Sequence, residues 1–517
     1  MNKKFYVTTP IFYVNAAPHL GHAYADVIAD TLARWHRGIG ERTFFLSGTD
    51  EHGAKIVRAA QKAGMPISDF VEERRDEFKQ LLIALGALND DFIYTSDSER
   101  HWPGAAALWK KLVDAGDLYK ATYKGLYCVG HEAFVTEKDL ADGKCADHNQ
   151  APEEIAEENY FFRLSKYRDR IKSAIISGEM SIQPASRKKE ILAFLEEGVE
   201  DISFSRPSKD ISWGIQVPDD HEHTMYVWAD ALTNYISVLG YGRSDDANFK
   251  TFWPADAHII GKDILRFHAV IWPGMLLSAG LPLPKMLLVT GMIRSGGQKM
   301  SKTIGNVVDP FECINEYGKD AFRYFLLREI PFGEDGDFTS ERFHDVYEGN
   351  LAHGMGNLVS RTSAMIIKYF DGQITKPKVE SLAGVPTRRG GDGEVSLDHY
   401  FDNNIAKEFS RAMSEYRITD AITLLSSFFS LLDGYIQDYE PYRLIKTDPD
   451  KTKTVLWNVA IHIIRASRLL ESFMPDTATK MMRVFGANIK MAENIDVIKI
   501  EPCGSIFPSK SDESKAD

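Results

Sequence analysis

The sequence of 517 residues predicts an α/β protein in which a doubly wound parallel sheet is split by an inserted domain and followed by an α-helical bundle. Three observations support this prediction. Strand-like and helix-like runs alternate over residues 1–117 and resume over residues 216–290, as in βαβ units. Residues 118–215 interrupt the alternation and contain two Cys-x-x-His pairs. From about residue 345, apolar residues recur at i, i+3, i+4 and i+7, the period of an amphipathic helix.

The two parts of the sheet are predicted from short runs of apolar, β-branched and aromatic residues, bounded by helix-like runs. Because the runs alternate with helices, we expect parallel strands joined by crossover connections. The strands are expected at residues 5–12, 42–47 and 92–95 in the first part and at residues 224–228, 257–260 and 286–290 in the second. The helices are expected at residues 24–37, 54–63, 67–85 and 264–277.

The chain is expected to contain six segments. The helical bundle is the longest, and residues 421–436 and 455–470 each carry an apolar stripe. A stretch rich in Pro and Gly, residues 377–393, is expected to be a loop, and residues 509–517 are expected to be disordered. The segments are residues 1–117 (first half of the sheet domain), 118–215 (inserted connective domain), 216–290 (second half of the sheet domain), 291–344 (lysine-rich loop and linking subdomain), 345–490 (helical bundle) and 491–517 (C-terminal tail).

Composition and charge restrict the class of protein. Hydrophobic residues make up 44% and charged residues 26% of the chain, as in a globular protein, and no apolar run approaches the roughly 20 residues that cross a bilayer. The net charge of -13 argues against non-specific binding of nucleic acid, but it allows a partner that touches RNA at a few places. With only 4 Cys, a disulfide scaffold is not expected, and we expect a cytoplasmic protein with no membrane partner.

The segment His19-Leu-Gly-His22 follows the first predicted strand and begins the first predicted helix. Such a turn presents free backbone N–H groups and a partial positive charge, which favour a phosphate group. Gly21 allows a ligand to approach the backbone closely, and the two histidines can donate hydrogen bonds to phosphate oxygens. Taken alone, the motif is equally compatible with two surface histidines at the start of a helix.

A second segment, Lys299-Met-Ser-Lys302, follows two glycines in a predicted loop. A mobile loop with two lysines can close on a triphosphate and stabilise the charge of the leaving pyrophosphate. Taken alone, a Lys-x-x-Lys sequence is more often an exposed basic loop.

In this order and setting, the two segments resemble the signature motifs of class I aminoacyl-tRNA synthetases, and their surroundings resemble the methionyl-tRNA synthetases. The similarity covers residues 4–480 and implies a Rossmann-type catalytic domain. The family usually follows the second lysine with Ser, whereas this chain has Thr303, which retains a hydroxyl group. The other similar stretches are Tyr13, Asn15 and Pro18 before the first motif, residues 48–53, 226–235 and 261–268, and residues 320–327 after the second motif.

The resemblance implies an enzyme that activates L-methionine with ATP and Mg²⁺ to methionyl-adenylate and pyrophosphate. The methionyl group would then pass to the 3′ end of the methionine tRNA, initiator and elongator. In this enzyme Asp50 would bind the substrate ammonium, and Asp263 would accept hydrogen bonds from the ribose hydroxyls. The implied catalytic residues are His19, His22, Lys299 and Lys302; ATP would also contact Gly21, Gly261, Asp263 and Ser301; and methionine would contact Ile11, Tyr13, Asp50, Trp228, Ala231, Leu232, Tyr235, Ile264, Phe267 and His268.

Several alternatives stay open at this point. On local grounds Asp50 is also a good helix N-cap, and apolar residues at such spacings more often belong to an ordinary core. The whole chain is also compatible with an enzyme for leucine or cysteine, or with a catalytically silent RNA-binding relative. The short insertion argues against the leucyl enzymes, which usually carry a large editing domain, and the intact His and Lys motifs argue against a silent protein.

The inserted domain contains a candidate zinc knuckle. Cys128, His131, Cys145 and His148 have the spacing of a tetrahedral zinc site. The family more commonly has Cys at the place of His131, and it includes zinc-free members, so a knuckle that folds without metal is an equal alternative.

The helical bundle contains a candidate anticodon site. Asn357 and Arg361 are separated by one helical turn, and the resemblance implies that this pair reads the methionine anticodon. Tyr442 stands where the family has a Trp that stacks on a base, and Tyr can also stack. Without the resemblance, an ordinary polar i, i+4 pair would be favoured. The chain ends soon after the bundle, without the appended tRNA-binding domain that often accompanies dimerisation in the family, so we expect a monomer.

Overall fold

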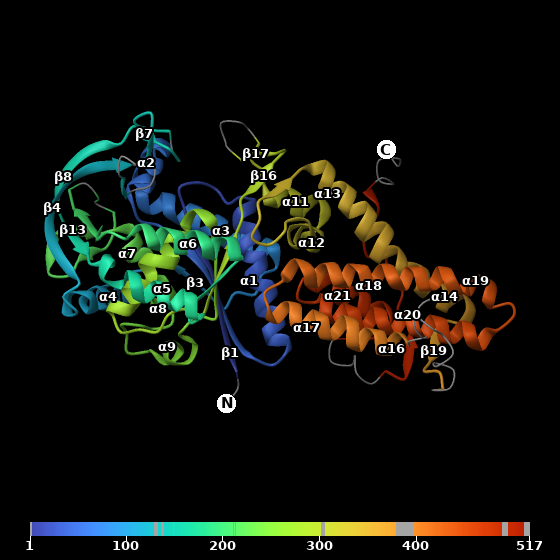
Figure 1. Ribbon diagram of the computed structural model, residues 1–517. Helices are drawn as coiled ribbons and strands as arrows, with labels where there is room; N and C mark the ends of the chain where they lie inside the picture. Colours follow the sequence, from blue (N-terminus) through green and yellow to red (C-terminus); the bar gives the residue numbers. More distant parts are fainter. Residues whose placement is uncertain are drawn as a thin grey trace. The chain divides into compact units, whose positions relative to one another are not determined.

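The structure is a computed structural model with two compact units, residues 1–292 and 293–517, each of which is described by itself (Figure 1). Among the helices that the structure describes, none combines the length and the apolar character that a membrane span requires. The described residues are 3–128, 133–135, 139–147, 149–209, 211, 213–300, 306–378, 396–488 and 495–510.

A six-stranded parallel sheet forms the centre of the first unit, in the strand order β3-β2-β1-β14-β15-β9. The chain extends the sheet from β1 to one side with β2 and β3 and to the other side with β14 and β15. The strand order therefore reverses between β1 and β14, and in doubly wound sheets ligands bind at the carboxyl ends of the strands at this point. The sheet confirms the predicted fold class. Its strands are β1 (Lys4–Tyr13), β2 (Arg42–Asp50), β3 (Asp91–Tyr94), β9 (Ser181–Gln183), β14 (Ala257–Gly261) and β15 (Met286–Thr290).

The central strand β1 combines a buried run with a shift of register. Residues 5–9 are all buried, as expected for a parallel strand that is covered on both faces. Pro10 has no N–H to donate to a neighbouring strand, and the pairing with β2 shifts between Thr8 and Ile11. After the shift, Tyr13 lies opposite Asp50, so the predicted substrate-binding ends of β1 and β2 are neighbours.

Helices lie around this sheet (Figure 1). The first of them, α1, begins directly after β1 and is buried from Ala23 to Trp35. Its buried Asp30 forms an ion pair with Arg34 at 2.7 Å, so the charge is not left without a partner. The helices of this unit are α1 (Leu20–Gly38), α2 (Ala54–Ala63), α3 (Ile67–Leu85), α4 (Trp102–Asp114), η2 (Leu164–Tyr167), α5 (Arg168–Ser177), α6 (Ala185–Glu197), α7 (Val227–Ala231), α8 (Asn234–Ser237), α9 (Ala247–Phe252), η3 (Lys262–Ile264), η4 (Phe267–Ile271) and α10 (Trp272–Ser278).

Two smaller antiparallel sheets and a short hairpin lie between β3 and β14 in the sequence. The long strands β4 and β8 pair over ten positions, beginning with Leu118 opposite Phe162. Strand β9 differs from its sequence neighbours, because it pairs in parallel with β15 of the main sheet although it lies within the span predicted as an insertion. These strands are β10 (Ile202–Ser203), β8 (Glu153–Phe162), β4 (Leu118–Cys128) and β5 (Ala133–Val135) in one sheet; β11 (Ser205–Pro207), β13 (Asp220–Met225) and β12 (Gln216–Val217) in the other; and β6 (Leu140–Ala141) with β7 (Lys144–Cys145) in the hairpin.

The prediction of a main-sheet strand at residues 224–228 is wrong. Thr224 and Met225 end the antiparallel strand β13, and helix α7 begins at Val227. The apolar run is too short for its periodicity to distinguish a strand from a helix.

The second unit begins with a β-hairpin, which takes in the glycines and Lys299 of the predicted loop. Strands β16 and β17 pair through Arg294 with Lys299 and through Ser295 with Gln298. Gly296 and Gly297 form the turn with φ of 60° and 76°, a pair of positive values that a type I′ turn requires and that glycine adopts without strain. The strands of this sheet are β17 (Gln298–Lys299), β16 (Ile293–Ser295) and β18 (Gly336–Phe338).

The remainder of the second unit is mainly helical, which confirms the predicted helical C-terminal region (Figure 1). Within it, Asp320 accepts a hydrogen bond from the backbone N–H of Thr477 at 2.6 Å, and the fully buried Arg323 donates to the carbonyl oxygen of Phe473 at 2.7 Å. The segment 320–327 therefore links α12 to the start of α21. The helices are α11 (Pro310–Tyr317), α12 (Lys319–Glu329), α13 (Ser340–Val346), η5 (Tyr347–Gly356), α14 (Asn357–Phe370), α16 (Leu397–Tyr400), η6 (Phe401–Ala406), α17 (Lys407–Ser414), α18 (Ile418–Tyr439), α19 (Pro441–Leu444), α20 (Pro449–Leu470) and α21 (Pro475–Val484).

Part of the C-terminal tail packs on this unit. The hydroxyl of Ser509 and the backbone N–H of Lys510 both donate to the carboxylate of Glu348, at 2.9 and 2.6 Å. These two residues therefore differ from the predicted disorder, whereas residues 511–517 and residues 379–393 of the predicted loop lie outside the described residues. Two short strands also pair in antiparallel fashion, β19 (Gln373–Thr375) with β20 (Val497–Lys499).

Candidate active site

The first predicted motif forms the N-terminal cap of α1, directly after β1. The ring Nδ1 of His19 accepts a hydrogen bond from the backbone N–H of Gly21 at 3.1 Å, and Nδ1 of His22 accepts from the backbone N–H of His19 at 3.1 Å. The two imidazole rings stack with their centroids 3.8 Å apart. A Cβ atom on residue 21 would lie 3.0 Å from the ring of His19, so glycine gives this ring its room.

The cap fixes the chemical form of both histidines. Burial lowers the pKa of His19, and the charge of Asp263 offsets part of this effect. Burial, with a smaller contribution from His19, lowers the pKa of His22 well below its ordinary value. Both rings are therefore neutral near pH 7, and because Nδ1 is an acceptor in each ring, the ring proton lies on Nε2. Each histidine can offer an Nε2–H group to an anion.

Gly261 and Asp263 lie across the reversal point of the sheet, where β14 ends. Asp263 is exposed, in the short helix η3, and its charge acts on His19. A Cβ atom on residue 261 would lie 2.4 Å from Oδ1 of Asp263, so a side chain at this position would displace the carboxylate. The residues predicted to bind phosphate and ribose therefore lie at neighbouring strand ends, and Asp263 is close enough to His19 for its charge to act on the ring.

Asp50 is the last residue of β2 and is 5% exposed. Its Oδ1 atom accepts hydrogen bonds from the backbone N–H of His52 and from the hydroxyl of Thr95, both at 3.4 Å. The strand pairing places Tyr13 beside Asp50 and Ile11 beside Gly48. Asp50 is therefore not a helix N-cap, since α2 is preceded by Gly53.

Aromatic residues predicted to bind methionine form one cluster. Trp228 and Phe267 stack with their centroids 3.9 Å apart and their planes 12° from parallel, and His268 meets Trp228 edge-on at 6.2 Å. Trp228, Ile264 and Ile11 are partly exposed and pack against the main core. Behind them, Ala231 and Leu232 are buried.

A chain of hydrogen bonds closes the buried end of this cluster. The hydroxyl of Tyr235 lies 2.8 Å from Nε2 of His268, whose Nδ1 lies 2.9 Å from the carbonyl oxygen of Ile264. Burial lowers the pKa of His268 to about 4, so the ring is neutral and Nδ1 carries the proton that the carbonyl accepts. Burial raises the pKa of Tyr235, and the negative charge of Asp50 raises it further. Asp50 and Tyr235 are therefore close enough to interact electrostatically.

The second predicted motif belongs to the other unit. Lys299 is the last residue of β17, after the Gly296–Gly297 turn. Ser301, Lys302 and Thr303 lie outside the described residues.

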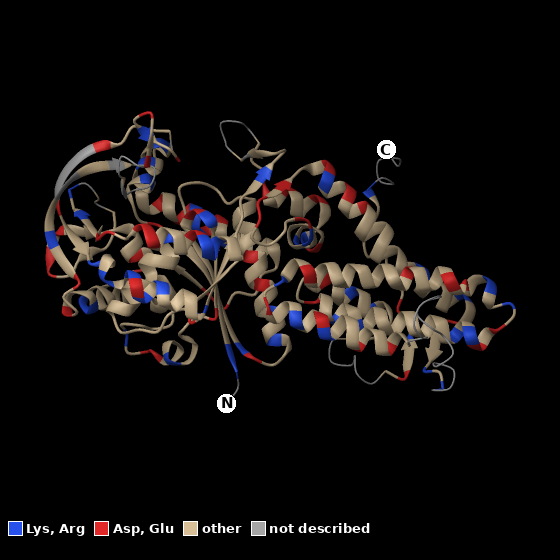
Figure 2. Cartoon of the chain, in the orientation of Figure 1, with Lys and Arg blue, Asp and Glu red and all other residues tan. Residues whose placement is uncertain are grey.

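The predicted anticodon residues lie on two helices of the second unit, Asn357 and Arg361 on α14 and Tyr442 on α19. Arg361 on α14 forms an ion pair with Asp433 on α18 at 2.8 Å, and Asn357 is exposed one turn earlier. Tyr442 on α19 is 46% exposed; its hydrogen bond to Glu440 raises its pKa, and the positive charge of Arg361 acts in the opposite direction. Arg361 and Tyr442 therefore share one surface, and Figure 2 shows charges of both signs interspersed along these helices.

Half of the predicted zinc site falls on described residues. Cys128 and Cys145 are both buried and pack in one small cluster with Val135. His131 and His148 lie outside the described residues, and within the described part of the chain no three potential ligands gather around one point.

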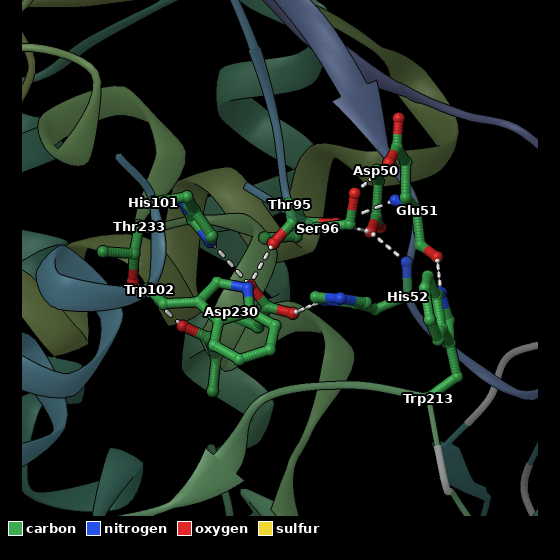
Figure 3. Close-up of polar contacts among 12 residues, drawn as sticks. Asp50, Glu51, His52, Thr95, Ser96, His101, Trp102, Trp213, Asp230 and Thr233 are labelled. Carbon is green, nitrogen blue, oxygen red and sulfur yellow. Dashed lines mark hydrogen bonds and ion pairs between the residues drawn. The ribbon is translucent and has the colours of Figure 1, made fainter. Parts of the chain in front are cut away.

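The structure adds a buried polar network that the sequence did not indicate. His52, His101 and Asp230 meet beside Asp50, and all three are buried (Figure 3). His52 and Asp230 belong to the stretches 48–53 and 226–235. The resemblance assigned roles to other residues of these stretches, but not to His52 or Asp230. His101 has no motif around it, and no signal in the sequence marks it.

Comparison with known proteins agrees with this geometry. Residues 5–146 and 135–363 match the family described as tRNA synthetases class I (M), and residues 386–500 match the anticodon binding domain of methionyl tRNA ligase. The methionine--tRNA ligase of Caldanaerobacter subterraneus subsp. tengcongensis is 42% identical over 94% of this chain and 74% of its own length. That of Brucella suis biovar 1 is 39% identical over 96% of this chain and 94% of its own.

A solved structure shows the same fold. The Mycobacterium tuberculosis methionyl-tRNA synthetase in complex with methionyl-adenylate is 34% identical, with a TM-score of 0.91 over 98% of this chain and 100% of that one. These matches favour methionine over leucine or cysteine as the amino acid. The chain therefore belongs to the methionyl-tRNA synthetases, the class I aminoacyl-tRNA ligases for methionine.

Proposed function

We propose that methionyl-adenylate forms in the crevice at the carboxyl ends of β1 and β14. The carboxylate of L-methionine attacks the α-phosphorus of Mg²⁺-bound ATP, an O–P bond forms, and the bond to the leaving pyrophosphate breaks. The 3′ end of the methionine tRNA, initiator or elongator, then takes the methionyl group and AMP leaves. One observation carries the proposal: at the strand-order reversal the charge of Asp263 acts on His19, and the charge of Asp50 acts on Tyr235 in the aromatic cluster.

On the ATP side, we propose that the Nε2–H groups of His19 and His22 donate to the phosphates as negative charge grows at the α-phosphorus. Gly21 lets the phosphate approach the start of α1, where backbone N–H groups and the helix dipole favour an anion. Gly261 and Asp263 take the ribose, with the carboxylate accepting from its hydroxyls. Lys299, Ser301 and Lys302 would act from a loop that closes on the leaving pyrophosphate.

On the methionine side, we propose that Asp50 holds the ammonium and that the aromatic cluster holds the thioether. Contacts between sulfur and an aromatic ring contribute about 0.3–1.5 kcal/mol each, which suits Trp228 and Phe267. Tyr13 and His268 supply polar contacts near the sulfur. The remaining pocket residues are Ile11, Ala231, Leu232, Tyr235 and Ile264.

Methionine should support exchange of labelled pyrophosphate into ATP, and leucine and cysteine should do so at least about tenfold less efficiently, because one methylene in such a pocket discriminates by about 10- to 200-fold. Efficient exchange with leucine or cysteine would contradict the proposed methionine pocket.

The variant Lys302→Ala should lower exchange by about 100-fold or more while it retains tRNA binding. A wild-type protein that binds tRNA without any exchange would instead be the silent relative.

We also propose that Asn357, Arg361 and Tyr442 read the anticodon. Arg361→Ala should lower kcat/KM for tRNA about 10- to 100-fold in aminoacylation, since a hydrogen bond from a charged donor is lost. Methionine-dependent pyrophosphate exchange should stay unchanged, because it does not need tRNA. The matched control is Arg411→Ala, another arginine of this unit that pairs with a glutamate on its own helix. Equal losses in both variants would count against a specific role for Arg361.

We propose that Cys128, His131, Cys145 and His148 hold a structural zinc ion. The donor set fits zinc, because the two buried cysteine side chains already share one cluster. Protein purified without chelator should contain close to one zinc per chain, and Cys145→Ser should remove it. Wild-type protein with far less zinc than this would show that the knuckle folds without metal.

The domain boundaries that we propose are those predicted from the sequence. We propose residues 1–117 and 216–290 as the two halves of the catalytic domain, 118–215 as the connective insertion, 291–344 as the lysine-rich loop and linking subdomain, 345–490 as the anticodon-binding bundle and 491–517 as the tail. We further propose a cytoplasmic monomer.

A further inference from the structure

A buried carboxylate joins two segments of the proposed methionine pocket. Asp230 on α7 is 1% exposed, and its two oxygens face two different histidines. Oδ2 lies 2.6 Å from Nδ1 of His52, and Oδ1 lies 2.7 Å from Nε2 of His101 (Figure 3). His52 and His101 are 3% and 0% exposed, so the three side chains form a contact that water does not screen.

In this contact the carboxylate of Asp230 is ionised and accepts hydrogen bonds from two N–H donors. Burial alone would raise the pKa of Asp230, but the neighbouring His52 and the hydrogen bond from His101 outweigh it, and the pKa is lowered. An ionised carboxylate accepts from Nδ1–H of His52 and from Nε2–H of His101. The second nitrogen of His101, Nδ1, lies 2.8 Å from the hydroxyl of Ser237 on α8.

The two ends of this contact belong to different parts of the proposed pocket. His52 follows Asp50 by two residues, and its backbone N–H donates to Oδ1 of Asp50. Asp230 lies between Trp228 and Ala231, which we propose contact the methionine side chain. A short path of hydrogen bonds and backbone therefore runs from the ammonium end of the substrate to its thioether end.

His101 anchors the same carboxylate to a third element. It precedes α4, and the N–H groups of Gly104 and Ala105 bond to its carbonyl oxygen at 3.0 and 3.1 Å. The backbone of His101 is therefore held at the start of α4, and its ring links this helix to α7 through Asp230. The ammonium-binding end of β2 and the short helix α7 are thus both tied to the scaffold through one residue.

We infer that Asp230 is a positioning residue for methionine, which holds Asp50 and the pocket residues of α7 at a fixed separation through His52. The inference rests on the proposed roles of Asp50 and the aromatic cluster. A separation that is fixed before the substrate binds lowers the cost of ordering the pocket, so its loss should weaken methionine binding more than ATP binding.

The variants His52→Leu and His52→Asn test the inference. Leucine keeps the apolar volume but removes the donor, whereas the amide nitrogen of asparagine can take the place of Nδ1. His52→Leu should raise KM for methionine by about 10- to 100-fold in pyrophosphate exchange, the effect of a lost hydrogen bond to a charged group, with KM for ATP changed by less than about threefold. His52→Asn should restore most of the methionine affinity.

Asp117→Asn is the matched structural control. Asp117 is also a buried carboxylate, and it accepts from Lys166 and from Ser278, both at 2.7 Å, but it lies outside the proposed pocket. This variant should lower the melting temperature without a selective change in KM for methionine. If His52→Leu does not fold, Asp230→Asn keeps the volume and removes the charge, and it should raise KM for methionine selectively.

Three results would overturn the inference: an unchanged KM for methionine, equal increases for methionine and ATP, or no recovery in His52→Asn. Asp50→Asn separates this failure from a failure of the proposed function. If Asp50→Asn weakens methionine while His52→Leu and Asp230→Asn do not, the pocket stands and the positioning role is wrong. If Asp50→Asn itself has no effect on methionine, the proposed pocket is wrong.

Discussion

Replacement of His22 by Ala should lower kcat of methionine-dependent pyrophosphate exchange by about 100- to 1,000-fold, the loss measured when one preorganised donor to a developing charge is removed. His22 is neutral with its proton on Nε2, because Nδ1 accepts the backbone N–H of His19 and burial lowers its pKa well below the ordinary value. The Nε2–H group is therefore held ready before the reaction. Because it acts mainly on charge that develops at the α-phosphorus, KM for ATP should change by less than about threefold.

The pH dependence gives a second check on this prediction. A histidine with a lowered pKa takes up its proton only below the ordinary value of about 6.5, so the wild-type exchange rate should not fall between pH 8 and 6.5 through His22. The control His36→Ala removes another histidine from the last turn of the same helix, which lies 2.6 Å from Glu41. It should leave kcat within about threefold of wild type. A fall in His22→Ala that ATP saturation reverses would show a binding role instead.

The main sheet could be predicted where a strand is long and buried. β1 and β2 are ten and nine residues long and have long buried runs, so their composition identifies them. β9 has three residues, and only its pairing with β15 makes it a strand of this sheet. Residues 224–228 read as a strand because a short apolar run has no distinctive period, and tertiary context decides between strand and helix.

The candidate site was predictable where its residues adjoin in sequence. His19, Gly21 and His22 form one turn, and the cap that orients them is local. The network around Asp230 was not predictable, because His52 and His101 lie 178 and 129 residues before Asp230 in the chain and contact it only in the folded protein. Sequence pattern gives no means to pair such residues. The roles of Lys299, Ser301 and Lys302 stay predictions.

Asp50→Asn should lower kcat/KM for methionine by about 30- to 5,000-fold, the equivalent of about 2–5 kcal/mol for truncation of a buried, hydrogen-bonded charge pair. Asp50 is 5% exposed, so in the variant water has little access to solvate the substrate ammonium in place of the lost carboxylate charge. Its Oδ1 atom accepts from the backbone N–H of His52 and from the hydroxyl of Thr95, and an asparagine oxygen can keep both contacts. The substitution therefore removes charge more than structure, and KM for ATP should be nearly unchanged.

A methionine analogue without the amino group makes this prediction specific to the ammonium. Such an analogue has no partner for Asp50, so its inhibition constant should be the same for wild-type enzyme and Asp50→Asn. The wild-type enzyme should prefer methionine over the analogue, and the variant should lose most of this preference, because the difference between the two ligands is the charge pair itself. Equal weakening of methionine and of the analogue would mean that the substitution disturbs the whole pocket. In that case Asp50 acts on the junction of β1 and β2, where it lies opposite Tyr13, and another group binds the ammonium.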